Sequence, residues 1–148
     1  MKSLNKSATR TFRAIIEQLN GSDACKIDNR PAFMALHVDR LQAVEAGTIY
    51  SLAHYFKQNG DMCCDPDMTF LVSSTGASAG RPELDGVYPL TFQQAIPPIY
   101  QDAIEWDGPK IQGVRPKMQA DHTRFANTWL RNIREQQGLA GKAVSHVK

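Results

Sequence analysis

One stretch, residues 50–70, constrains the fold most, because two strand-like runs flank a cluster of turn-forming residues. The first run, residues 48–57, is rich in β-branched and aromatic residues whose side chains alternate between two faces. A second strand-like run covers residues 68–72. The span 59–67 between them begins with Asn59-Gly60 and is rich in turn formers. We therefore predict an antiparallel hairpin whose tip is residues 59–67, too long for a two-residue turn.

Two amphipathic helices are predicted, one near each end of the chain. Ser7 or Thr9 is the expected cap of the first helix, and Gly21 is placed to end it. Asp121 is the expected cap of the second helix, which Gly138 ends. In both segments apolar residues recur at three- and four-residue spacing, which is typical of a helix with one buried face.

The remaining strand-like runs complete the predicted fold. They cover residues 33–38, 87–92, 99–106 and 111–118. Short connections favour antiparallel pairing of neighbouring strands. The sequence therefore predicts an α+β fold, an antiparallel sheet of four to five strands flanked by an N-terminal and a C-terminal helix. Residues 1–138 are expected to form a single domain and residues 139–148 a flexible tail.

Charge is distributed unevenly along the 148 residues. Residues 1–20 carry four basic residues and one acidic residue, residues 110–148 carry eight and two, and residues 21–109 carry five and twelve. Basic ends around an acidic centre indicate either a surface for nucleic acid or another partner, or two charge sets that neutralise each other within the fold. No apolar run is long enough to cross a membrane, and no signal-peptide pattern occurs, so we expect a cytoplasmic protein.

The three cysteines, Cys25, Cys63 and Cys64, give an odd count without C-x-x-C spacing. That pattern argues against a disulfide framework and against a zinc site built of cysteine pairs. Adjacent cysteines bridge only in a strained geometry, so we expect Cys63 and Cys64 to be reduced, half-buried thiols.

Three carboxylates, Asp61, Asp65 and Asp67, form the first candidate site. Hard cations such as Mg²⁺ and Ca²⁺ bind several carboxylate oxygens at about 2.0–2.6 Å, and one loop can supply them. The spacing lacks the pattern of an EF-hand, and Gly-Asp and Asp-Pro pairs are typical of turns. Two interpretations stay open for these residues: a structural turn or partner-contact surface, and a divalent-metal site.

His54 is the second candidate, as a general base or as a metal ligand beside the aspartates. Strand geometry counts against this role, because at about 3.3 Å per residue His54 lies roughly 13 Å from the start of the predicted tip. With the pairing centred near residues 62–63, His54 faces about Leu71. We therefore expect a satisfied or partly buried histidine that is separate from the carboxylates.

Arg124, Arg131 and Arg134 project from one side of the predicted C-terminal helix and form a basic stripe. Together with the first helix, this stripe is a candidate surface for phosphates or for a partner, although solvated helix faces often share the pattern. The sequence contains no nucleophile-elbow, phosphate-loop or dinucleotide-binding motif.

Four segments together carry a resemblance to a known family: FMALHVDRL, SLAHYFKQNGDMCCDPDMTF, YPLTFQQAIPPIYQ and FANTWLRNIREQQG. The most specific motif is H-Y-x-x-Q-N-G-D followed by D-P-x-M, formed by His54, Tyr55, Gln58, Asn59, Gly60, Asp61, Asp65, Pro66 and Met68. Over residues 31–138 the chain resembles an uncharacterised family of small domains carried by plasmids, integrative elements and phages. Pro97-Pro98 departs from that family's third motif, and predicts a break between two strands.

The resemblance implies an accessory protein of a mobile genetic element and transfers no catalytic role. We therefore expect a non-enzymatic protein, without a cofactor, that binds a host or element macromolecule, for example as an inhibitor of a CRISPR or restriction complex. A protein partner is the leading expectation; nucleic acid bound by the basic helices and a homo-oligomer are the others. The alternative is a phosphodiesterase-like hydrolase that uses Mg²⁺ or another divalent cation with Asp61, Asp65, Asp67 and His54.

Overall fold

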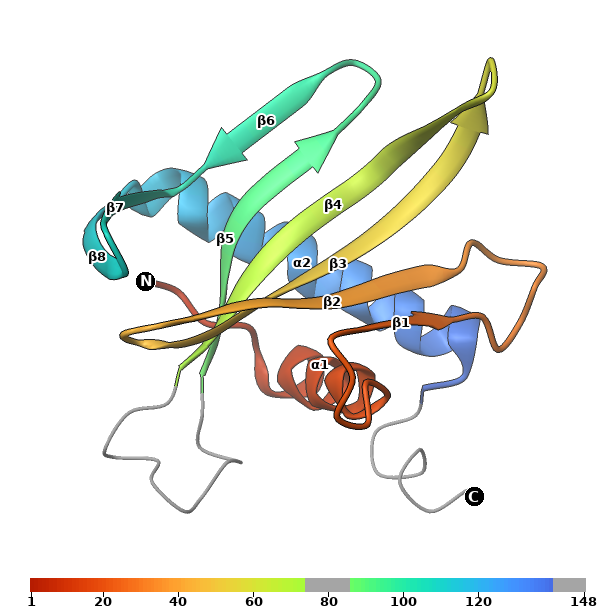
Figure 1. Cartoon of the computed structure of the whole chain (residues 1–148), viewed down its shortest axis with the longest axis horizontal. Helices are drawn as coiled ribbons and strands as arrows, with labels where there is room; N and C mark the ends of the chain where they lie inside the picture. Colours follow the sequence, from red (N-terminus) through yellow and green to blue (C-terminus); the bar gives the residue numbers. More distant parts are fainter. Residues whose placement is uncertain (74–85, 140–148) are drawn as a thin grey trace.

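The computed structural model describes residues 1–73 and 86–139 and has the predicted α+β fold (Figure 1). Its elements are α1 (Lys6–Glu17), β1 (Ala24–Ile27), β2 (Leu36–Val44), β3 (Gly47–Gln58), β4 (Asp61–Ser73), β5 (Val87–Gln94), β6 (Ile99–Asp102), β7 (Ile104–Asp107), β8 (Lys110–Val114) and α2 (Pro116–Gln137). Strands β1 to β6 form one antiparallel sheet in sequence order, and β7 and β8 form a separate two-stranded sheet.

The main sheet has six strands, so the expected four to five strands were too few. β1 lies outside the predicted strand-like runs, in a polar segment, and its backbone pairs with residues 36–39 of β2. The predicted strand 99–106 divides at Ala103 into β6 and β7. There the Asp102 carboxylate accepts a hydrogen bond of 3.0 Å from the Ile104 N–H, which turns the chain out of the main sheet.

The predicted long hairpin tip is wrong, because β3 and β4 are joined by the two residues Asn59 and Gly60 alone. Both have positive φ angles, 53° and 87°, which are the values of the tight turn that Asn-Gly favours. Residues 61–67 therefore belong to β4, and Asp61, Asp65 and Asp67 lie on a strand rather than in a loop.

Both helices begin at residues other than the predicted caps. Asn5 caps α1, since its side-chain oxygen accepts a hydrogen bond of 2.7 Å from the Ala8 N–H. α2 starts at Pro116, a residue suited to the first turn because it has no N–H to leave unpaired, so Asp121 lies inside the helix and does not cap it. The end of α2 is confirmed: Gly138 has a φ of 71° and closes the helix.

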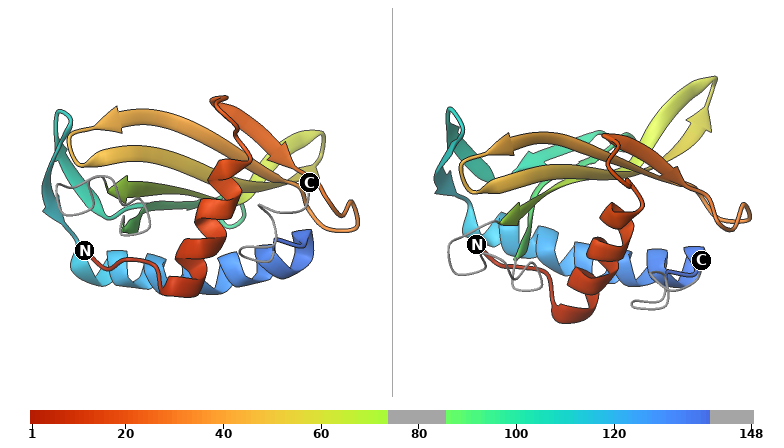
Figure 2. Two further views of the ribbon diagram at one scale, coloured as in Figure 1. Left: turned by 90° about the horizontal axis from the view of Figure 1, so that it is seen from below. Right: turned by 60° about the horizontal axis from the view of Figure 1, so that its bottom comes forward.

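α1 and α2 both lie against the same face of the sheet, as the two views of Figure 2 show. Phe12 of α1 is fully buried, with its ring centroid 6.1 Å from that of Tyr50 and 5.0 Å from that of Phe70. The main core also contains Leu36, Val38, Leu52, Met68, Val87, Ala126, Trp129, Leu130 and Ile133. Within residues 1–73 and 86–139, no helix is long and apolar enough to cross a membrane.

A second, smaller core lies at the end of the sheet where β2 turns into β3. Ile49 and Leu71 alternate along their strands with main-core residues, so they face away from the helices. They pack with Leu90, Ala103 and Ile104, and the β7–β8 hairpin lies over them. The remainder of this face is not covered by a helix of the described chain (Figure 2).

Candidate functional site

The hairpin of β3 and β4 projects beyond the rest of the sheet (Figures 1 and 2), and we call residues 54–66 the arm. β2 pairs with β3 as far as Ala53, and β5 pairs with β4 as far as Asp67. Beyond these points the two strands of the arm pair with each other. One further backbone bond, from the Ala95 N–H to the Cys64 carbonyl at 3.1 Å, fixes the base of the arm.

The arm holds nearly all of the H-Y-x-x-Q-N-G-D and D-P-x-M residues. Among its members, Asp61 lies exposed at the tip opposite Gln58, and Asp65 lies exposed near the base. Asp67 lies just below the arm, opposite Ala53, and is half-buried. The three carboxylates therefore do not converge on one point, and within residues 1–73 and 86–139 no three His, Cys, Asp or Glu side chains are grouped so that they could hold a metal ion.

The predicted register, in which His54 faces Leu71, is wrong. Because the turn has two residues, the pairing centres on residues 59–60, and Ala53 pairs with Asp67 while Tyr55 pairs with Cys64. Between these pairs β4 contains one extra residue, a bulge that leaves His54 opposite Asp65 and Pro66. His54 therefore does not face Leu71. The negative charge of Asp65 acts to raise the pKa of His54.

His54 is nonetheless buried, with 5% of its surface exposed. Its Nδ1 accepts a hydrogen bond of 3.3 Å from the indole N–H of Trp129, and the two rings meet edge to face at 5.4 Å. Its Nε2 has no hydrogen-bond partner among the described residues. Burial lowers the pKa of His54, and this effect outweighs the opposing influence of Asp65, so the ring is neutral at pH 7.

His122 of α2 is a second buried histidine, 3% exposed. Its Nε2 lies 3.0 Å from Oε1 of Gln101, and its ring stacks on Phe92 with the centroids 6.0 Å apart. Nδ1 has no partner in the part of the chain that the structure describes. Burial lowers the pKa of His122 more than the charges of Asp121 and Asp102 raise it.

Phe125 of α2 lies between Phe92, which stacks on His122, and Trp129, which contacts His54 of β3. Its ring is 5.2 Å from Phe92 and 6.1 Å from Trp129, which completes an aromatic row along the helix. Although Phe125 fits the apolar spacing of α2, 42% of its surface is exposed. His122, Ala126, Trp129 and Ile133, which follow the same three- and four-residue spacing, are buried.

The sheet face opposite the helices carries polar and aromatic side chains, and of these only Tyr55 and Asp67 were candidates from the sequence. We call the open part of it the outer face; its residues are His37, Asp39, Ser51, Ala53, Tyr55, Asp67, Thr69, Thr91, Gln93 and Tyr100. His37 and Asp39 alternate with the buried Leu36 and Val38, and this alternation is the sequence signal for their position. The rings of His37 and Tyr55 meet edge to face at 5.0 Å.

Electrostatic coupling on the outer face centres on Asp67. Burial raises the pKa of Asp67, and the negative charge of Asp39 raises it further. The pKa of Tyr55 is also raised, by burial first and then by the charges of Asp67, Cys64 and Asp39. The outer face is therefore an acidic surface with an aromatic margin.

All three cysteines are free and half-buried, which confirms the expectation for Cys63 and Cys64. Burial raises the pKa of the Cys64 thiol, and the charge of Asp67 adds to this effect. A thiol with a raised pKa stays protonated at neutral pH and is a weak nucleophile.

The predicted basic stripe is partly engaged within the fold. Arg124 forms an ion pair with Asp121 on the same helix, and Arg134 donates a hydrogen bond of 2.8 Å to the hydroxyl of Ser7 in α1. Arg131 is exposed and borders a surface pocket of about 310 Å³ between the start of α1 and α2. Hence Arg134 links the two helices, and Arg124 and Arg131 face solvent.

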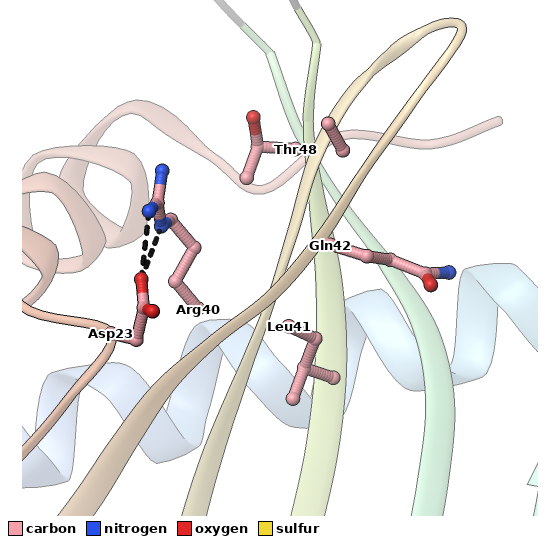
Figure 3. Close-up of a pocket in the computed structure, with 6 residues that line it drawn as sticks. Asp23, Arg40, Leu41, Gln42 and Thr48 are labelled. Atoms are coloured by element: carbon pink, nitrogen blue, oxygen red, sulfur yellow. Dashed lines mark hydrogen bonds and ion pairs between the residues drawn. The ribbon is translucent and has the colours of Figure 1, made fainter.

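A further pocket, of about 300 Å³, lies where β1 meets the outer part of β2 (Figure 3). Its charged residues, Arg40 and Asp23, are joined by hydrogen bonds of 2.7 and 3.1 Å, drawn as dashed lines in Figure 3. Both side chains are more than half exposed, so the pair is a surface contact that ties the edge strand to the sheet.

Comparison with known proteins gives one match. The family model described as a domain of unknown function, DUF6908, matches residues 10–139, which include the arm, the outer face and the aromatic row. No curated protein and no solved structure matches the chain. Because the match covers most of the chain, from within α1 to the end of α2, the chain belongs to the DUF6908 family.

Proposed function

We propose that this protein is a non-enzymatic interaction module, and that a protein partner binds the arm and the adjoining outer face. The observation that carries the proposal is the arm itself, a hairpin that projects from the sheet (Figure 1) and whose strands, beyond the bond from Ala95 to Cys64, pair only with each other among the described residues. Free strand edges invite pairing with another chain, and soluble proteins usually cover or shorten them unless they are used for contact.

The side chains of the arm support the same proposal. Met62 is 57% exposed at the tip, and Lys57, Gln58 and Asp61 around it are exposed as well. An exposed apolar side chain rimmed by polar ones is typical of contact surfaces. All residues of the most specific motif except Met68 fall on this projection, and most of these lie outside the hydrophobic core.

The biological setting of the proposal comes from the resemblance to domains carried by plasmids, integrative elements and phages. On that basis the module serves a mobile genetic element, and inhibition of a host CRISPR or restriction complex is one concrete version of its role. Binding through the basic helices to nucleic acid is the competing mode, and the experiment below separates the two.

The test is retention of a partner from host lysate by the tagged full-length chain, with and without nuclease treatment. We expect a nuclease-resistant protein partner that the wild type retains and that the D61N/D65N variant retains at least tenfold less. The matched control is R124Q/R131Q, which removes two exposed charges from α2 and is expected to bind as the wild type does.

Three results would contradict the proposal. One is that the wild type retains no partner under either condition. Another is that R124Q/R131Q loses the partner and D61N/D65N keeps it, which assigns binding to the helices. The third is that the partner disappears after nuclease treatment, which assigns binding to nucleic acid.

A further inference from the structure

One edge of the arm presents backbone groups that no neighbouring strand uses. β2 pairs with β3 only as far as Ala53, and beyond this residue the two strands diverge (Figure 1). We call residues 54–58 the β3 edge of the arm; they run past the end of β2, on the side of β3 that β2 covers up to Ala53. Among the described residues, no backbone hydrogen bond from outside the arm reaches this edge.

The register of the arm shows which of these backbone groups point outward. In an antiparallel hairpin the pair next to a two-residue turn is hydrogen-bonded, and such pairs alternate with pairs whose N–H and C=O groups point away from the hairpin. The outward pairs of the arm are therefore Lys57–Met62 and Tyr55–Cys64. The bond from the Ala95 N–H to the Cys64 carbonyl agrees, because it comes from outside the arm. On the β3 edge, Tyr55 and Lys57 thus offer two N–H donors and two carbonyl acceptors.

The opposite edge of the arm, formed by β4, is less suited to pairing with another chain. Its outward carbonyl at Cys64 already accepts the bond from Ala95, and Pro66 has no N–H to donate. The bulge in β4 opposite His54 also interrupts the regular ladder there. Proline residues and bulges protect edge strands from pairing with another chain, and the β3 edge contains neither.

The side chains of the β3 edge specify what a paired segment carries. Tyr55 and Lys57 alternate along β3 with His54 and Phe56, so Lys57 lies on the side of the outer face and Phe56 on the side of the helices. Lys57 is exposed and takes part in no ion pair among the described residues, and Phe56 is half-buried. Directly opposite residues of neighbouring strands contact each other, so an acidic residue suits the position opposite Lys57 and an apolar residue that opposite Phe56.

We infer that the protein partner adds an extended segment to the β3 edge of the arm as a further strand, with an acidic residue opposite Lys57 and an apolar residue opposite Phe56. This inference rests on the proposed function and names the chemistry of the partner. Main-chain hydrogen bonds to Tyr55 and Lys57 provide the affinity, and the alternating side chains provide the specificity. The added strand takes the place beside β3 that β2 takes in the rest of the sheet.

The test is an NMR titration of the ¹⁵N-labelled full chain with the peptide acetyl-Val-Glu-Val-Thr-Val-amide at millimolar concentrations. In antiparallel pairing its Glu lies opposite Lys57 and its central Val opposite Phe56. The matched control probe is the same peptide N-methylated at Glu and Thr, the residues whose N–H groups face β3. We expect saturable shifts of the Tyr55 and Lys57 amides with the first peptide and no saturable shift with the second.

Two proline variants make the matched comparison within the chain. K57P removes an outward N–H from the β3 edge, and M62P removes the outward N–H of the residue paired with it on β4. Neither substitution removes a hydrogen bond between the two strands of the arm, and the amide shifts of Gln58 and Asp61 check that the arm stays paired. K57P is expected to weaken the response to the peptide at least tenfold, and M62P to leave it unchanged. K57Q, which keeps the N–H and loses the charge, is expected to retain a saturable response.

Equal responses to both peptides, a response that K57P keeps and M62P loses, or no saturable shift in the wild type would overturn the inference. Self-association of the chain that K57P abolishes would overturn it too, because the occupant would then be a second copy. These results are distinguishable from failure of the proposed function. A lysate partner retained equally by the wild type and K57P refutes only the added strand, whereas a responsive β3 edge without any retained partner refutes the interaction module.

Discussion

Replacing Phe12 with alanine is expected to lower the free energy of unfolding by about 3–5 kcal/mol. Phe12 is fully buried and is the residue of α1 that packs on Tyr50 and Phe70 of the sheet. Removing its ring leaves a cavity at the point where helix and sheet meet, which the rigid sheet cannot close. Domains are stable by about 5–15 kcal/mol in total, so the variant loses a large part of its stability.

Urea unfolding followed by circular dichroism measures this loss. The matched control is Phe33→Ala. Because Phe33 is 43% exposed, its replacement should lower the free energy of unfolding by about 0.5 kcal/mol or less. A loss below about 1 kcal/mol for Phe12→Ala, or equal losses for the two variants, would show that α1 does not pack on the sheet as described.

Stability is also expected to fall as the pH drops below about 6.5, because two buried histidines resist protonation. In the native state the pKa values of His54 and His122 are lowered, chiefly by burial, so the unfolded chain binds protons first. The stability that the two neutral histidines contribute is therefore fully present above pH 6.5. It is lost as the pH falls from 6.5 to the lowered native pKa values. Each unit of difference between the unfolded and native pKa values changes the free energy of unfolding by about 1.4 kcal/mol per histidine.

Urea unfolding at about pH 7.5 and about pH 5 tests this expectation when wild type and variants are compared. His54→Asn keeps an acceptor for the Trp129 N–H, and His122→Gln keeps a donor toward Gln101, so the double variant should lose most of the pH dependence between these values. The control is His37→Gln, which removes a histidine of the outer face. An unchanged pH dependence in the double variant would contradict the assignment.

Local sequence patterns predicted the elements better than their ends. The spacing of apolar residues located both helices, and Gly138 marked the end of α2 because only a residue tolerant of positive φ fits there. The caps were misassigned, since several side chains near each start can accept a hydrogen bond and the packing decides which one does. β1 was missed because an edge strand of four residues is recognised by its pairing with β2, not by its composition.

The candidate site depended on register, which no local pattern provides. Aspartate favours turns, so Asp61, Asp65 and Asp67 were assigned to a loop, whereas the Asn59-Gly60 turn places them on β4. The two-residue turn and the bulge in β4 together place Asp65 opposite His54 on the neighbouring strand. The outer face required the alignment of three strands, because Asp39 and Asp67 are 28 positions apart in the chain and lie on either side of β3.

The most direct test of the account is a comparison of photocrosslinking from two positions of the chain in living cells. A photoreactive amino acid replaces Met62, which is 57% exposed at the tip of the arm, or Arg131, which is exposed on α2. The account predicts a discrete protein adduct from position 62 and none from position 131. An adduct from position 131 without one from position 62 would contradict it, because the contact surface would then be the helices and not the arm.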